Sequence, residues 1–161
     1  MNLRRYFLVL AMSLVLSPTV TQAAESGLNI EVWKSPTCGC CKEWIKHLTE
    51  NGFTVTAYDV GNNAARATLG MPRKFGSCHT GLIDGYVIEG HVPASDIKRL
   101  LASRPDAIGL TVPGMPIGSP GMDGPMYEGQ QDPYEVLLID QKKESSVFNR
   151  YHYDKQFNSV H

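Results

Sequence analysis

The chain has 161 residues, 42% of them hydrophobic, with 15 lysines and arginines against 16 acidic residues and four cysteines. This length fits one domain with a sizeable core and is too short for two comfortable ones. A formal net charge of -1 without any basic run excludes the electrostatic surface of a nucleic-acid-binding protein. The composition also excludes a disordered, collagen-like or disulfide-dense chain.

The N-terminal segment has the layout of a secretory signal peptide. Arg4 and Arg5 form a positive start, an apolar run follows at 6–16, and small residues lead to an expected cleavage site after Ala23. A membrane anchor needs about 20 apolar residues, and this run is too short. We therefore expect residues 1–23 to be removed on export to a bacterial periplasm, with no membrane span in the remaining chain. In that oxidising compartment, cysteines are disulfide-bonded, metal-bound or both in turn.

Alternating and helical hydrophobic patterns then divide the chain into short elements. In chain order they predict a strand at 28–33, a helix at 40–51, a strand at 53–60, a short helix from 62 or 63 to 69, strands at 80–83 and 86–89, and a helix that opens at 93–95 and ends near 103. The last two strands flank Asp84-Gly85, a strong signal for a hairpin turn. This order is typical of a thioredoxin-like domain, in which helices flank a central sheet of parallel and antiparallel strands.

The chain beyond these elements is predicted to be partly irregular. Residues 113–125 are rich in glycine, proline and methionine and cannot form a regular element. Patterns at 135–140 and 146–151 predict a C-terminal β-hairpin. We therefore expect an α/β fold with one thioredoxin-like domain at 28–151, followed by a polar tail at 152–161.

Cys38 and Cys41 form a Cys-x-x-Cys pair between a predicted strand and a predicted helix. At a helix N-terminus, unpaired backbone N–H groups and the helix dipole lower the pKa of a thiol. The spacing over a first helical turn also allows the two sulfurs to close a disulfide. We expect Cys38 to be the more exposed thiol and Cys41, on the apolar helix face, to be its sheltered partner in a candidate redox pair.

A third cysteine, Cys40, lies inside this motif, and Cys78 stands alone further along the chain. In a thioredoxin-like fold the loop before the third strand lies against the Cys-x-x-Cys turn, which would bring Cys78 close to the motif. Soft thiolates select Cu(I) and Zn(II), and three cysteines within four residues suit a bridged Cu(I) cluster. Two alternatives remain open: a plain disulfide with two idle cysteines, and structural zinc on all four.

The five histidines are also considered as ligands. His79, next to the isolated cysteine, is either a metal ligand or an ordinary loop residue. We expect His47 and His91 at the surface, whereas His152 and His161 belong to the polar tail.

Met115, Met122 and Met126 fall in the irregular segment. Methionine is normally a core filler, but this segment offers little core to fill. Thioether sulfur binds Cu(I) without deprotonation, so we expect Met115 and Met122 to ligate copper or to cover a soft-metal site. Met126 and Met71 are further candidates. The alternative is an exposed methionine-rich docking surface for a partner protein.

A family resemblance is carried by four segments: the Cys-x-Cys-Cys motif in 35–41, Cys78-His79, the run at 84–93, and the methionine-containing loop at 112–122. Together they closely resemble the CopG-like family of periplasmic copper-resistance proteins, over about 28–151 of this chain. The resemblance implies a thioredoxin-like fold and copper binding coupled to redox change. It also implies a set of copper ligands with two methionines nearby: Cys38, Cys40, Cys41 and Cys78, with Met115 and Met122.

The sequence thus leads to one functional hypothesis and two rivals. We expect a periplasmic copper-binding protein for copper resistance that holds Cu(I), as a multinuclear thiolate cluster, and couples Cu(I)/Cu(II) to the Cys38–Cys41 dithiol. One rival is a thiol–disulfide oxidoreductase acting on protein cysteines. The other is a copper chaperone or buffer without turnover. The partners expected beside copper ions are other periplasmic copper-handling or redox proteins.

Overall fold

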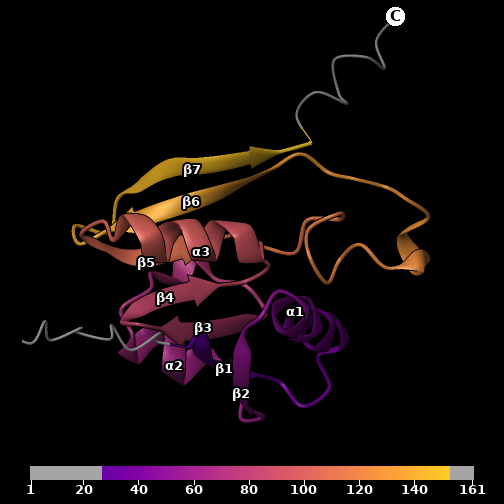
Figure 1. The fold of residues 1–161 in the computed structure, drawn as a ribbon, viewed down its shortest axis with the longest axis horizontal. Helices are drawn as coiled ribbons and strands as arrows, with labels where there is room; N and C mark the ends of the chain where they lie inside the picture. Colours follow the sequence, from indigo (N-terminus) through magenta and orange to yellow (C-terminus); the bar gives the residue numbers. More distant parts are fainter. Residues whose placement is uncertain (1–26, 153–161) are drawn as a thin grey trace, which may run out of the picture.

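The structure, a computed structural model, describes residues 27–152. The expected signal peptide at 1–23 lies outside the described residues, as does the expected polar tail at 152–161 except for its first residue, His152. Within the described part, seven strands form one sheet in the order β2-β1-β3-β4-β5-β6-β7 (Figure 1). The strands are β1 (Asn29–Lys34), β2 (Thr54–Tyr58), β3 (His79–Ile83), β4 (Tyr86–Glu89), β5 (Ala107–Thr111), β6 (Tyr134–Asp140) and β7 (Ser145–Tyr151).

The sheet mixes both kinds of strand pairing, as the sequence predicts. β1 pairs with β2, and β4 with β5, in parallel. The remaining neighbours pair antiparallel, including β3 with β4 across the predicted Asp84-Gly85 turn and the C-terminal hairpin of β6 and β7. The expected α/β class and the expected C-terminal hairpin are therefore confirmed.

Helices cover both faces of this sheet. They are α1 (Gly39–Glu50), α2 (Asn63–Thr68) and α3 (Ala94–Ser103), with the short 3-10 turns η1 (Arg73–Phe75) and η2 (Pro125–Tyr127). Side chains of α1 and α3 share one buried cluster with the sheet residues Val32 and Ile88. Met71 and Phe75, which follow α2, pack on the opposite face against Val87, the neighbour of Ile88 in β4. Adjacent strand residues point to opposite faces, so β4 contributes to both layers.

Helix α1 is held against the sheet by its apolar face. Cys41, Trp44 and Leu48 are all fully buried, at the helical spacing that the sequence predicts. The indole Nε1 of Trp44 also donates a hydrogen bond of 2.9 Å to the carbonyl oxygen of Val92, in the connection between β4 and α3. This contact fixes the start of α1, where the cysteine motif lies, relative to the chain that follows β4.

Strand β5 is not among the elements expected from the sequence. Its five residues include Gly109, and Pro105 and Pro113 stand close to its two ends, so the segment looks like a loop. In the structure, β5 lies so close to β4 that a Cβ at Gly109 would overlap the carbonyl oxygen of Val87. The close packing of these two strands thus requires a glycine at position 109.

No helix within residues 27–152 is both long and apolar enough to cross a membrane.

Candidate metal centre

The cysteine motif lies at the N-terminus of α1. Cys38 is the residue before the helix, and its Sγ accepts a hydrogen bond of 3.3 Å from the backbone N–H of Cys41. The two residues are joined by a disulfide, with their Cα atoms 5.4 Å apart. Cys41 is fully buried, whereas Cys38 is partly exposed, as the helical spacing predicts. The start of this helix therefore presents one sulfur of the pair to solvent and shelters the other.

The other two cysteines are free thiols beside this disulfide. Cys78, directly before β3, has its Sγ 3.5 Å from that of Cys41 and 3.7 Å from that of Cys40. The Sγ atoms of Cys40 and Cys38 are 3.6 Å apart. All four sulfurs lie within 4.8 Å of one another, so each is close enough to share a metal ion. The expected approach of Cys78 to the helical motif is present in the structure.

Two histidines extend this sulfur cluster. His79 Nδ1 lies 3.3 Å, and His91 Nε2 lies 3.2 Å, from the Sγ of Cys78. Both imidazoles are fully buried. Cys78, His79 and His91 therefore form a second group of possible metal ligands that shares one sulfur with the first.

The expectation of a surface position is wrong for His91. This residue follows β4, and the chain there passes beneath the irregular loop, whose Pro120 carbonyl oxygen lies 2.9 Å from His91 Nδ1. Since a carbonyl can only accept, Nδ1 carries the proton, and the lone pair of Nε2 points to Cys78. This tautomer leaves Nε2 ready to bind a metal ion.

His47 lies partly at the surface, as expected, but it also has a structural role. Its side chain is half-buried, and its Nε2 accepts a hydrogen bond of 3.1 Å from the backbone N–H of Ala94, the first residue of α3. Backbone N–H groups in the first turn of a helix have no partner within the helix. His47 therefore caps α3 and links it to α1.

Burial favours the uncharged forms of the Cys78 thiol and of the two imidazoles in the absence of metal. Burial, followed by the neighbouring Cys40, raises the pKa of the Cys78 thiol to about 12. Burial also lowers the pKa of His91 and holds that of His79 well below its usual value. His79 Nε2 is buried with no hydrogen-bond partner among residues 27–152. Neutral imidazole is the metal-binding form, while the thiol must lose its proton when metal binds.

A buried ion pair fixes the backbone just before Cys78. The backbone N–H of Ser77 donates to Glu89 Oε1 at 2.7 Å, and the carbonyl oxygen of Ser77 accepts from Arg66 Nη2 and from Asn62 Nδ2. Arg66 Nε in turn donates to Glu89 Oε1 at 2.9 Å. Both charged side chains are buried. We call Arg66, Glu89 and Asn62 the Ser77 clamp, because together they hold both backbone polar groups of Ser77.

The irregular loop between β5 and β6 lies against the start of α1. Gly121, at a φ of 84°, packs so closely that a Cβ there would be 2.7 Å from both the Cys40 oxygen and the Trp44 nitrogen. Only glycine accommodates this conformation and this approach at little cost. Together with the contact from Pro120 to His91, this packing brings the loop to the cysteines.

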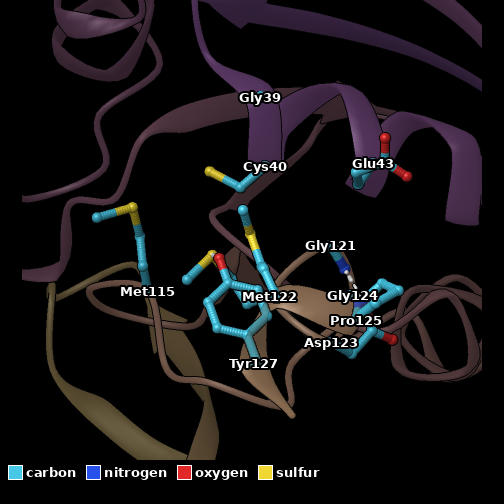
Figure 2. Close-up of a pocket in the computed structure, with 11 residues that line it drawn as sticks. Gly39, Cys40, Glu43, Met115, Gly121, Met122, Asp123, Gly124, Pro125 and Tyr127 are labelled. Atoms are coloured by element: carbon cyan, nitrogen blue, oxygen red, sulfur yellow. Dashed lines mark hydrogen bonds between the residues drawn. The ribbon is translucent and has the colours of Figure 1, made fainter. Parts of the chain in front are cut away.

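A pocket of about 730 Å³ lies between this loop and the start of α1, where Cys40 is located (Figure 2). Three methionines line it together with Cys40: Met115, Met122 and Met126. Met122 is buried, and its Sδ accepts a hydrogen bond of 3.4 Å from the hydroxyl of Tyr127. Met115 and Met126 are 53% and 80% exposed, so neither fills a core. Met71, by contrast, is buried in the second core cluster, away from the pocket, so for this residue the core-filling interpretation holds.

The α/β fold and the sulfur cluster define a candidate soft-metal-binding protein. Two solved structures of a copper resistance protein CopG, Form 1 and Form 2, are 48% and 47% identical to the chain, each with a TM-score of 0.72. The matches cover 78% of this chain and 98% and 99% of the two structures. The chain therefore belongs to the CopG family of copper resistance proteins, as the sequence motifs indicate. A family described as "Protein of unknown function, DUF411" matches residues 75–122, and the comparison with curated proteins gave no match.

Proposed function

We propose that this chain is a periplasmic copper-binding protein for copper resistance. Its cargo would be Cu(I), held by the four cysteine sulfurs. One observation carries the proposal: four sulfurs from two distant segments lie within 4.8 Å of one another in a chain whose relatives are named for copper resistance. Thiolate sulfur is a soft ligand that selects Cu(I) over hard cations. A periplasmic location is supported by the signal-like pattern at 1–23.

The redox state of Cys38 and Cys41 would control how much copper is held. A disulfide sulfur is not a thiolate, so copper on all four sulfurs requires reduction of the Cys38–Cys41 bond. With the bond closed, Cys40 and Cys78 remain as thiols beside His79 and His91. Copper loading and oxidation therefore compete for the same atoms, and oxidation of the pair by two Cu(II) would yield two Cu(I) and release two protons.

Short distances between the sulfurs favour a multinuclear cluster. Cys78 belongs to both possible ligand groups, so its sulfur can bridge two copper ions. The pocket methionines would act at the outer edge of this cluster. Met115 and Met126 are exposed there and suit capture or transfer of Cu(I), whereas Met122 is buried and suits a position that covers the cluster.

A thioredoxin-like core would explain why the cysteines meet. The order β1-α1-β2-α2-β3-β4-α3, with parallel β1 and β2 and antiparallel β3 and β4, supports this assignment. In such a core the first helix and the loop before the third strand bring their ends to one site. β5 to β7 would then be an addition that carries the methionine loop.

Copper content measured together with free thiols tests this function. Protein produced with copper and purified under reducing conditions is expected to retain copper after desalting, and oxidation of Cys38 and Cys41 should lower the amount retained. Reduced protein that holds no copper would overturn the proposal. X-ray absorption at the copper edge would then identify sulfur and imidazole ligands in the loaded protein.

The second candidate is a thiol–disulfide oxidoreductase acting on protein cysteines. The observation in its favour is the disulfide at a helix start, with partly exposed Cys38 and buried Cys41. Disulfide reductase or isomerase activity that survives Cys40→Ser and the loss of Met115 and Met122 would favour it. A copper chaperone or buffer differs only in that the oxidation state of the copper does not change.

A further inference from the structure

Cys40 and Cys78 are the two free thiols of the cluster, and their Sγ atoms are 3.7 Å apart. Each is also close to the existing disulfide, but Cys38 and Cys41 are already bonded to each other. The nearest thiol available to Cys40 is therefore that of Cys78. We propose that Cys40 and Cys78 form a second disulfide, so that the fully reduced site is a four-electron reductant of Cu(II). This inference rests on the proposed function, because it takes copper as the oxidant.

The surroundings of the two thiols suit this bond. The Ser77 clamp holds the backbone before Cys78, so the sulfur of Cys78 stays beside the helix start. Cys40 lines the pocket and is only partly buried, which leaves its side chain room to turn (Figure 2). The two Sγ atoms must move from 3.7 Å apart to a bond length of about 2.05 Å. Rotation of the Cys40 side chain would supply this movement.

The chemistry balances with Cu(II) as the named oxidant. The S–H bonds of Cys40 and Cys78 break, one S–S bond forms, two electrons reduce two Cu(II) to two Cu(I), and two protons pass to water. The Cys38–Cys41 pair reacts in the same way. The fully oxidised chain has no thiolate left at the site, so it would release the Cu(I) held by the cysteines, and only reduction would restore these ligands.

Counting electrons and thiols on the same sample tests the proposal. Fully reduced protein is treated anaerobically with excess Cu(II) and a chromogenic chelator specific for Cu(I), then denatured, alkylated and weighed by mass spectrometry. We expect about four Cu(I) per chain and no alkylated cysteine, against about two Cu(I) for a single couple. Two Cu(I) with Cys40 and Cys78 alkylated would overturn the inference.

Cysteine variants distinguish a direct Cys40–Cys78 disulfide from thiol–disulfide exchange with the Cys38–Cys41 bond. The Cys38→Ser/Cys41→Ser double variant should still yield about two Cu(I) per chain and join tryptic peptides 35–42 and 75–98 through Cys40 and Cys78. Cys40→Ser, the matched control, should also yield about two, with Cys78 left open to alkylation. An unlinked double variant, or a Cys41–Cys78 bond in the wild-type protein, contradicts the proposal.

Ferricyanide replaces copper in a parallel experiment, because it is a one-electron oxidant that needs no metal site. If it closes both disulfides while the reduced protein retains no copper, the second disulfide stands and the copper function fails. If the reduced protein retains copper but ferricyanide leaves two thiols, the copper function stands and this inference fails.

Discussion

The Sγ of Cys78 lies 3.2 Å from Nε2 of His91, a residue 13 positions further along the chain. Cys78 also lies 3.5 Å from the Sγ of Cys41, so one sulfur joins the cysteine cluster to the buried imidazoles. Among the described residues, each group of three or more possible metal ligands includes the Sγ atom of Cys78. Cys78 is therefore the residue whose loss is expected to affect copper binding most broadly.

The first prediction concerns Cys78→Ser. A serine hydroxyl is a hard, protonated group at neutral pH and does not replace a thiolate, so both ligand groups lose a member. We expect at least about tenfold weaker Cu(I) affinity, measured by competition with a Cu(I) chelator. Met71→Leu, in the core away from the pocket, is the control and should bind copper like the wild-type protein. Equal affinity in Cys78→Ser would remove this residue from the site.

The second prediction concerns His91→Phe, which keeps a buried ring but removes both nitrogens. If Nε2 binds copper, we expect a loss of about tenfold or more in Cu(I) affinity and a decrease in nitrogen scattering at the copper edge. The thiol count should remain that of the wild-type protein. Unchanged nitrogen scattering would show that His91 only supports the loop through Pro120.

The third prediction concerns the exposed pocket methionines. Met115→Leu/Met126→Leu removes two thioethers at little cost in packing, because both side chains are exposed. We expect slower Cu(I) transfer from a chelator, with a nearly unchanged final copper content, as measured by stopped-flow absorbance. Met71→Leu serves again as the matched substitution. Transfer at the wild-type rate would contradict a role for these two residues in copper capture.

The fourth prediction concerns the Ser77 clamp. Glu89→Gln leaves the buried Arg66 charge without its partner, and breaking such a pair typically costs about 3–5 kcal/mol. We expect a fall of this size in the free energy of unfolding of the copper-free protein, and weaker copper binding through a displaced Cys78. The control is Glu50→Gln, because Glu50 pairs with Lys46 at the surface and should contribute less than about 1 kcal/mol. A similar fall in the free energy of unfolding in Glu89→Gln and Glu50→Gln would argue against a stabilising role of the Ser77 clamp.

The fifth prediction concerns pH and His47. Burial lowers the pKa of His47 below its usual 6.5. Only the neutral ring can accept the hydrogen bond from the Ala94 N–H. Its contribution to stability is thus present above 6.5 and is lost as the pH falls through the lowered folded-state pKa. We expect copper-free wild-type protein to lose more unfolding free energy between about pH 7.5 and about pH 5 than His47→Gln does.

The wild-type protein and His47→Gln both contain His79 and His91. The difference between their pH-dependent losses of unfolding free energy therefore reports on His47 alone. An equal loss in the wild-type protein and in the variant would show that the cap does not titrate.

Local patterns were sufficient to predict most of the fold. The apolar spacing of Cys41, Trp44 and Leu48 predicts α1, and the Asp84-Gly85 turn predicts the hairpin of β3 and β4. β5 escaped prediction because its character depends on packing against β4, where Gly109 meets Val87. That contact joins residues far apart in sequence, so no local pattern carries it.

The site was predictable where spacing within one element decides it. Three cysteines at a helix start are visible in the sequence, and the position of Cys78 follows from the expected order of elements. The burial of His91 depends on the loop that covers it, and the cap by His47 depends on how α1 meets α3. Gly121 shows why the methionine loop reaches Cys40, yet its sequence context marks only a turn.

The Cys38–Cys41 bond spans only three positions of sequence, whereas a Cys40–Cys78 bond would span 38. Chain-entropy arguments give about 2 kcal/mol of stabilisation for a loop this short and about 4 kcal/mol for the longer one. Opening the first bond therefore costs the fold less stability than opening the second would. Closing the Cys40–Cys78 bond would raise the melting temperature further. The melting temperature would then report how far the four cysteines are oxidised.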